Sequence, residues 1–193
     1  MAWLNVAEIV DATDAEGPGT RTAIWVQGCL KRCPSCCNPD FLKVEPASVI
    51  TVQQLKKQIE SNKEYFGIEG ITLLGGEPVL QALGLSELAE FAQCIGLSVM
   101  LFTGYKLEEL KEQQFSGIDK LLQYVDIVVD GEFELDEIEQ NRNWVGSENQ
   151  QFHYLSQRYN SAIEPLKEGV MTEWRIDPDG LVSANGIPFV VKV

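Results

Sequence analysis

The 193-residue sequence contains little positive charge: 15 lysines and arginines stand against 29 aspartates and glutamates, giving a formal net charge of −14. Proteins that bind nucleic acid need clustered basic residues to meet the phosphates, so we expect no nucleic-acid partner. The one basic pair of note is Lys31-Arg32. No apolar run approaches the roughly 20 residues of a membrane span, and no basic and apolar leader opens the chain. We therefore expect neither membrane insertion nor a secretory signal.

Cysteine and histidine are also scarce, with five cysteines and one histidine. In a chain without a secretory signal, cysteines fit a reducing cytoplasm, where clustered thiols more often bind metals or act in catalysis than form disulfides. Hydrophobic residues make up 45% of the chain, which is enough for a core, and the length is typical of one domain. We therefore predict a single cytoplasmic domain over residues 1–193.

Three of the five cysteines form the pattern C-x3-C-x2-C at Cys29, Cys33 and Cys36. Iron–sulfur clusters are held by cysteine thiolates, and a 4Fe-4S cubane has four irons. Three protein ligands leave one iron able to bind a small molecule, whereas four ligands are typical of an electron carrier. We interpret the three cysteines as the ligands of one 4Fe-4S cluster.

The spacing alone leaves two alternatives open. Cys33-Pro34-Ser35-Cys36 is also a C-x-x-C, the pattern of thioredoxin-like thiol exchange. A structural zinc ion needs a fourth ligand, which would have to be Cys37, Cys94 or His153. We expect Cys94 to be a small buried hydrophobe beside the apolar face of a helix. Cys37 is expected to be an inert thiol.

Apolar runs alternate with helical patterns along the chain. Strands are predicted at 3–11, 22–26, 70–74, 97–102 and 125–129, helices at 51–65, 85–95 and 107–115, and a hairpin over 171–183. Nearly all-apolar strands that alternate with helices are typical of a parallel sheet buried on both faces. The sequence therefore predicts an α/β fold with a mostly parallel sheet.

Glycines with polar neighbours end three of these strands, at Gly75-Gly76-Glu77, Thr103-Gly104 and Asp130-Gly131. The cysteine loop ends the strand at 22–26. The carboxyl ends of parallel strands meet at one edge of a sheet, so we expect the four segments to converge there. The paired glycines would let a ligand approach and expose backbone amides, and Glu77 could accept hydrogen bonds from a ligand ammonium. A plain strand-to-helix turn, with Pro78 near the helix start, is the alternative.

Together, the cysteine pattern and Gly75-Gly76-Glu77-Pro78 on the following strand resemble the radical S-adenosylmethionine (SAM) enzymes. Within them the chain is similar to glycyl-radical-enzyme activating proteins, in particular those of anaerobic ribonucleotide reductase. Ser35, before the third cysteine, favours that branch. The chain departs from the family pattern at Cys37, often aromatic, and at Val145 and Gln151, often arginines. The other resembling elements are Gly17-Pro18-Gly19-Thr20-Arg21, Gln27-Gly28, Asn38-Pro39, Thr103-Gly104-Tyr105, Val129-Asp130-Gly131 and Gly146-Ser147-Glu148-Asn149-Gln150.

The resemblance implies a partial (β/α) barrel in which Cys29, Cys33 and Cys36 hold the cluster and SAM chelates the open iron. It implies reductive cleavage of SAM to a 5′-deoxyadenosyl radical, which abstracts a hydrogen from a glycine of a partner enzyme, an anaerobic ribonucleotide reductase. A flavodoxin or ferredoxin would donate the electron. The implied SAM contacts are Gly75, Gly76 and Glu77, with Thr103 and Asp130 as further candidates.

Two alternatives to this activity remain from the sequence. A radical SAM enzyme that modifies a peptide or a small molecule would keep the cofactors and change the substrate. A non-catalytic iron–sulfur interaction module would keep the cluster and lack SAM cleavage.

Overall fold

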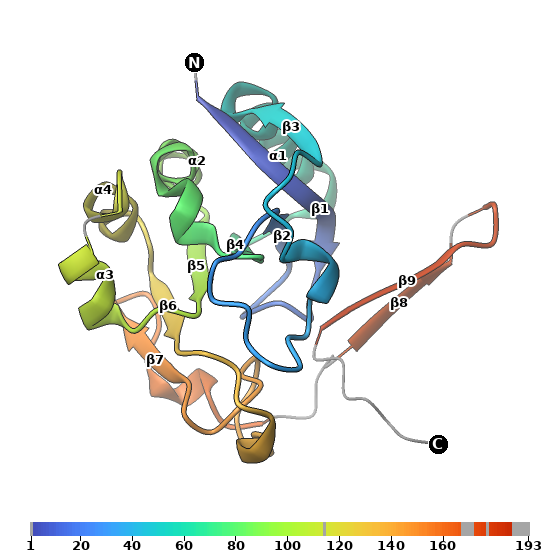
Figure 1. Ribbon diagram of the computed structural model, residues 1–193. Helices are drawn as coiled ribbons and strands as arrows, with labels where there is room; N and C mark the ends of the chain where they lie inside the picture. Colours follow the sequence, from blue (N-terminus) through green and yellow to red (C-terminus); the bar gives the residue numbers. More distant parts are fainter. Residues whose placement is uncertain (1, 114, 167–171, 177, 187–193) are drawn as a thin grey trace.

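The computed structural model describes residues 2–113, 115–166, 172–176 and 178–186, and its centre is a seven-stranded sheet (Figure 1). The strands follow the order β3-β1-β2-β4-β5-β6-β7. Their bounds are β1 (Trp3–Thr13), β2 (Arg21–Val26), β3 (Ser48–Thr51), β4 (Gly70–Gly75), β5 (Ser98–Thr103), β6 (Ile127–Asp130) and β7 (Gln151–Tyr154). A separate two-stranded sheet pairs β8 (Thr172–Ile176) with β9 (Val182–Gly186).

The centre of the large sheet is parallel and both of its edges are antiparallel. The β2–β4, β4–β5 and β5–β6 pairs are parallel, whereas β1 pairs antiparallel with both β2 and β3, and β7 pairs antiparallel with β6. The predicted mixed α/β fold with parallel central strands is therefore confirmed. The partial barrel stays a prediction.

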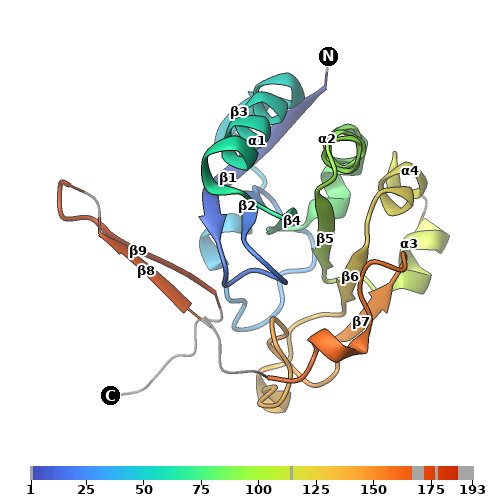
Figure 2. The same cartoon turned by 180° about the vertical axis from the view of Figure 1, so that it is seen from behind.

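Among the described residues, four α-helices connect these strands and lie on one face of the sheet (Figures 1 and 2). They are α1 (Val52–Phe66), α2 (Ala82–Cys94), α3 (Leu107–Gln113) and α4 (Ile118–Gln123). Thr51 starts α1 with a capping box, in which its hydroxyl accepts from the Gln54 amide while the Gln54 side chain accepts from the Thr51 amide. Buried aliphatic side chains of α1 and α2, such as Leu55 and Leu85, join Ile71 and Leu101 of the strands in the main core. No described helix is long and apolar enough to cross a membrane.

The opposite face of the sheet has a different cover, because no α-helix of the described residues packs there. Met100, Ile127 and Val129 meet side chains from the segment 144–163, among them Trp144 and Tyr159. The prediction that the sheet is buried on both faces is thus confirmed at its centre. The cover on this face comes from irregular structure, for which the sequence has no helical periodicity.

A buried arginine fastens the Gly17-Pro18-Gly19-Thr20 turn to the sheet. The Arg21 guanidinium, fully buried, donates to Thr72 Oγ1 at 2.8 Å, to Ser98 Oγ at 2.8 Å and to the Pro18 carbonyl at 2.9 Å. A buried charge is tolerated when its donors are satisfied in this way. The turn leads into β2, which delivers the chain to the cysteine loop.

Candidate iron–sulfur and SAM site

The predicted segments meet at one cavity, at the edge of the sheet where the parallel strands end. The cavity has a volume of about 190 Å³. Its walls include Cys29, Cys33 and Cys36 from the loop after β2, together with strand-end residues 75–77, 103–104 and 131. The predicted convergence of the cysteine loop with the ends of β4, β5 and β6 is therefore confirmed.

The cysteine loop is shaped by backbone conformations that only the structure reveals. Arg32 and Ser35 have positive φ angles of 54° and 59°. Non-glycine residues rarely adopt this region, and such strain is concentrated at functional sites. Because these residues directly precede Cys33 and Cys36, their left-handed turns orient the two thiols. Cys29 is 5% exposed, and its amide donates to the Leu42 carbonyl at 3.2 Å.

A charged pair next to Cys33 ties the loop to the residues that follow β6. The Lys31 ammonium lies 2.8 Å from Glu132 Oε1, and Glu132 Oε2 accepts a hydrogen bond from the Cys33 thiol at 3.5 Å. Burial, opposed by a hydrogen bond to the Phe133 backbone and aided by the Glu132 charge, raises the pKa of Cys33 to about 11. Cys33 is therefore a thiol in the metal-free chain, and its binding to iron releases a proton. The sequence did not single out Glu132, because it begins an acidic run over residues 132–137, and such a run is typical of a solvated face.

Gly75, the last residue of β4, and Gly76, which follows it, both serve the packing of the protein's own backbone. The Gly76 amide donates to the Val26 carbonyl at 2.8 Å, and the Glu77 amide donates to the Gly28 carbonyl at 2.9 Å. A Cβ on Gly76 would lie 2.4 Å from the Gly28 carbonyl oxygen and 2.7 Å from the Phe41 carbonyl oxygen. The expectation that the paired glycines expose their amides to a ligand is therefore wrong for Gly76. The amides extend the β2–β4 pairing into the cysteine loop instead.

The Glu77 side chain joins the ends of two neighbouring strands. It is 1% exposed, and its carboxylate accepts from Thr103 Oγ1 at 2.8 Å, from the Gly104 amide at 2.9 Å and from the Val79 amide at 3.2 Å. Burial raises the pKa of Glu77 to about 7, against the opposite effect of these hydrogen bonds. The local geometry of the alternative, a strand-to-helix turn with Pro78 near the helix start, is present, because Pro78–Gln81 form a 3₁₀ helix that Glu77 caps.

Asp130 is not among the residues that line the cavity, whereas the next residue, Gly131, is. Its carboxylate accepts from the Leu107 amide, at the start of α3, at 2.7 Å. The same oxygen lies 2.8 Å from His153 Nε2 on β7. These contacts make Asp130 a residue that positions α3 and β7, and its direct contact with SAM stays a prediction.

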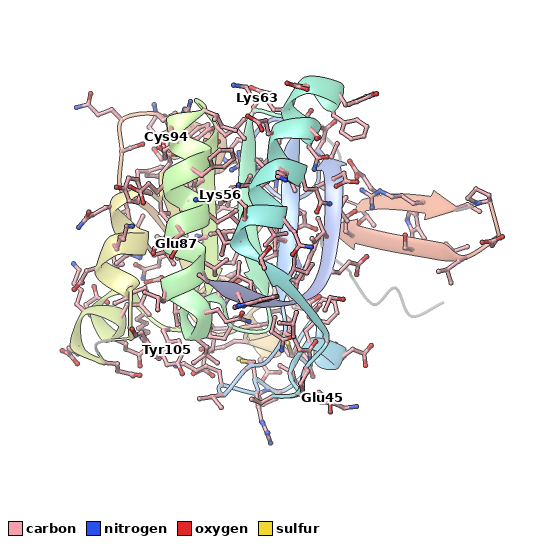
Figure 3. The ribbon with its side chains drawn as sticks, turned by 90° about the horizontal axis from the view of Figure 1, so that it is seen from above. Glu45, Lys56, Lys63, Glu87, Cys94 and Tyr105 are labelled. Carbon is pink, nitrogen blue, oxygen red and sulfur yellow. The ribbon has the colours of Figure 1, made fainter. Side chains whose placement is uncertain are left out.

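The two remaining cysteines lie apart from each other. Cys94 is exposed, so the prediction that it is buried is wrong, and Figure 3 shows it at the opposite edge of the fold from Tyr105, which lines the strand-end side. Successive residues of a helix are rotated by about 100° around its axis, and this rotation places Cys94 off the apolar face of α2. Cys37 is exposed and contributes to the cavity wall.

The donor set fits a cluster better than a single metal ion. Within the described ranges, no three His, Cys, Asp or Glu side chains are grouped to hold one ion. Zn–S bonds of about 2.3 Å bring the thiolates of a tetrahedral site to about 3.8 Å from one another. The thiolates of a cubane bind different irons and need not converge so closely. The three cysteines that line the cavity are free thiols, a donor set of the kind that holds a cluster.

A second buried carboxylate, Glu16, gives the folded chain a distinct pH dependence. Burial raises its pKa to about 7. A raised carboxyl pKa means that the folded state binds more protons than the unfolded state between about pH 4.5 and 7. The free energy of unfolding should therefore fall as pH rises through this window, by on the order of 3 kcal/mol each for Glu16 and Glu77.

We expect Glu16→Gln to remove about half of the fall in the free energy of unfolding that accompanies the rise in pH. Glutamine keeps an oxygen that can accept from the Gly186 amide, now 2.7 Å from Glu16 Oε1, while it cannot ionise. Urea unfolding at pH 5 and pH 7.5, with the wild type and variant in the same cluster state, measures the effect. An equally steep decline in Glu16→Gln would contradict the assignment of the titrating group.

Comparison with known proteins extends these observations. The family described as "4Fe-4S single cluster domain" matches residues 15–153. The anaerobic ribonucleoside-triphosphate reductase-activating protein of Escherichia coli (strain K12) is 33% identical over 159 residues, covering 79% of this chain and 99% of the relative. Its namesake in Salmonella typhimurium (strain LT2) is 34% identical over 145 residues, covering 72% and 91%. The one in Enterobacteria phage T4 is 29% identical over 152 residues, covering 76% and 92%.

The region matched by the family, residues 15–153, contains the cysteine loop and the ends of β4, β5 and β6 at the cavity. The β8–β9 hairpin lies beyond it.

Proposed function

The chain belongs to the family of anaerobic ribonucleoside-triphosphate reductase-activating proteins, and we propose that it acts as one: a radical SAM enzyme that generates a glycyl radical on a partner reductase. The observation that carries the proposal is the meeting of Cys29, Cys33 and Cys36 with residues 75–77 around one cavity. A cluster held by three thiolates and a cofactor held beside it need this arrangement.

Cys29, Cys33 and Cys36 are proposed as the ligands of the 4Fe-4S cluster. When bound, the cluster and SAM supply reductive cleavage of SAM to a 5′-deoxyadenosyl radical, which removes a hydrogen from a glycine of the partner. The chain's own residues position these groups. Lys31 and Glu132 hold the loop around Cys33, and the backbone bond from Glu77 to Gly28 holds the loop around Cys29.

Gly75, Gly76 and Glu77 are proposed to hold the methionine end of SAM. The Gly76 and Glu77 amides already donate hydrogen bonds within the protein. What this segment can still offer a ligand is oxygen acceptors, and these suit the ammonium of SAM. Thr103 lines the cavity and is held by Glu77, which makes it a candidate for a further contact. Asp130 is proposed to act on this site through its support of α3.

Around this site we propose a partial (β/α) barrel, a partner whose loop enters the cavity, and a protein that donates the electron. The parallel β2–β4–β5–β6 unit with helices on one face supports a partial (β/α) barrel. The cavity's open mouth supports entry of a glycine-bearing loop of the partner, an anaerobic ribonucleotide reductase. A flavodoxin or ferredoxin is proposed as electron donor, and a cluster held by free thiols suits a reducing cytoplasm.

The test is to load the chain with iron and sulfide under anaerobic conditions and incubate it with SAM, a reductant and an anaerobic ribonucleotide reductase. We expect 5′-deoxyadenosine to form and a glycyl-radical doublet to appear in the EPR spectrum of the reductase. SAM cleavage without the doublet would favour a peptide or small-molecule substrate. Iron binding without any SAM cleavage would favour the interaction module.

A further inference from the structure

The β8–β9 hairpin carries an exposed apolar face. It projects from the body of the fold, as Figures 1 and 2 both show. Trp174 pairs with Ala184 and Ile176 pairs with Val182, and because side chains alternate along a strand these residues share one face. The exposed fractions of Trp174, Ile176 and Val182 are 72%, 74% and 53%. We call these three side chains the hairpin patch.

Polar groups of the hairpin are used to anchor it to the body. The Glu173 carboxylate accepts from the Asp14 amide at 2.8 Å. The Asn185 amide group donates to Thr13 Oγ1 at 2.9 Å and to Glu16 Oε1 at 3.0 Å. The polarity is thus the reverse of that of an ordinary surface hairpin, whose apolar face packs on the core. An isolated two-stranded hairpin is marginally stable in water, and exposed apolar clusters mark interaction sites.

The base of the hairpin forms part of the cavity wall. Gly186 lines the cysteine cavity, and Ala184 and Asn185 line a second, adjoining cavity. Glu16 and Cys37 belong to the walls of both cavities. The hairpin that carries the patch therefore starts beside the opening through which a partner's glycine has to reach the cluster.

The size of the hairpin patch indicates what covers it. At roughly 150–250 Å² for each large side chain, its exposed area is on the order of 400 Å². A stable interface buries about 800 Å² on each partner, so a second copy seated on this patch alone would cover too little. A partner that covers the patch together with the adjoining cavity mouth reaches the required area.

We propose that the hairpin patch is a docking surface for the glycyl-radical partner, which presents an uncharged apolar patch beside the loop that enters the cavity. The proposal rests on the proposed function, because that function brings the partner to this opening. The contact is apolar, so its contribution to affinity should persist at high salt, where attraction between charged surfaces is screened. The hairpin would then determine which partner the chemistry of the cavity serves.

The test compares a double variant, Trp174→Ser with Ile176→Ser, with the wild type, both loaded with the cluster. Four quantities are measured: iron content, SAM cleavage without partner, the dissociation constant for an anaerobic ribonucleotide reductase, and the EPR doublet. We expect the dissociation constant to rise about tenfold or more, since buried tryptophans dominate interface energetics. The doublet at limiting partner concentration should fall in proportion, and iron content and partner-free SAM cleavage should stay unchanged.

Tyr65→Ser is the matched control, because Tyr65 is 86% exposed near the end of α1, at the edge of the sheet opposite the cavity. It should bind the partner as the wild type does. Val182→Lys is a second variant, which places a charge on the same face and should weaken binding at both low and high salt. If the double variant loses iron, the affinity of Val182→Lys for the reductase tests the docking surface instead.

Three outcomes are separable. Wild-type affinity in both hairpin variants overturns the docking proposal, and a glycyl-radical signal in that experiment leaves the proposed function intact. If both variants only break a dimer of this chain, the face belongs to a second copy and the proposal is also overturned. If the wild type cleaves SAM but produces no doublet, the proposed function fails, and the binding titration still decides the docking surface.

Discussion

Replacing any one of Cys29, Cys33 and Cys36 by alanine is expected to remove the cluster and to reduce SAM cleavage to background. Each thiol lines the cavity, and a cubane with only two protein ligands leaves two irons without a protein donor. Alanine offers no donor atom. Anaerobically loaded wild type should contain about four irons and four sulfides per chain, with the broad visible absorption of a cluster. The three variants should lose both the metal and the colour.

Cys94→Ala and Cys37→Ala are the controls for this result. Cys94 is exposed at the opposite edge of the fold, so its loss should leave iron content unchanged. Cys37→Ala is the stricter control, because Cys37 adjoins Cys36 and lines the same cavity. Loss of iron in Cys94→Ala together with retention in Cys29→Ala would show that the ligand assignment is wrong.

The sequence was sufficient to predict which segments meet. Apolar runs at 22–26, 70–74, 97–102 and 125–129 correspond to β2, β4, β5 and β6, and parallel strands have their carboxyl ends at one edge. The position of the cysteine loop and of residues 75–77 followed from that rule. The hairpin turn at Asp179-Gly180 was also predictable, because Asp-Gly suits the turn between two strands.

The parts that escaped prediction depend on tertiary contacts. The edge strands β3 and β7 have four residues each and only partial burial, so they show no clear apolar alternation. The role of Glu132 depends on a contact with Cys33, 99 positions away, which no local pattern encodes. The amide bonds of Gly76 and Glu77 depend on how closely β2 and β4 approach, and a Gly-Gly pair is equally compatible with ligand approach.

Gly76→Ala is expected to be among the most destabilising single substitutions in the chain. The added Cβ would lie 2.4 Å from the Gly28 carbonyl oxygen and 2.7 Å from the Phe41 carbonyl oxygen, and both are backbone atoms. No flexible side chain can move aside, so the end of β4 and the cysteine loop must separate. That movement breaks the 2.9 Å bond from the Glu77 amide to the Gly28 carbonyl. We expect a loss of about 3–5 kcal/mol in the free energy of unfolding.

Gly104→Ala separates this steric effect from the general cost of replacing a glycine beside the cavity. Its Cβ would meet Glu77 Oε2 at 3.5 Å, an ordinary contact, and the alanine amide could still donate to Glu77. We expect a change within about 1 kcal/mol and full iron loading. Gly76→Ala should lower both the midpoint of urea unfolding and the iron bound per chain, because the loop that carries Cys29 loses its support. Equal stability and iron content in the two variants would mean that the cysteine loop does not depend on the close approach of residue 76.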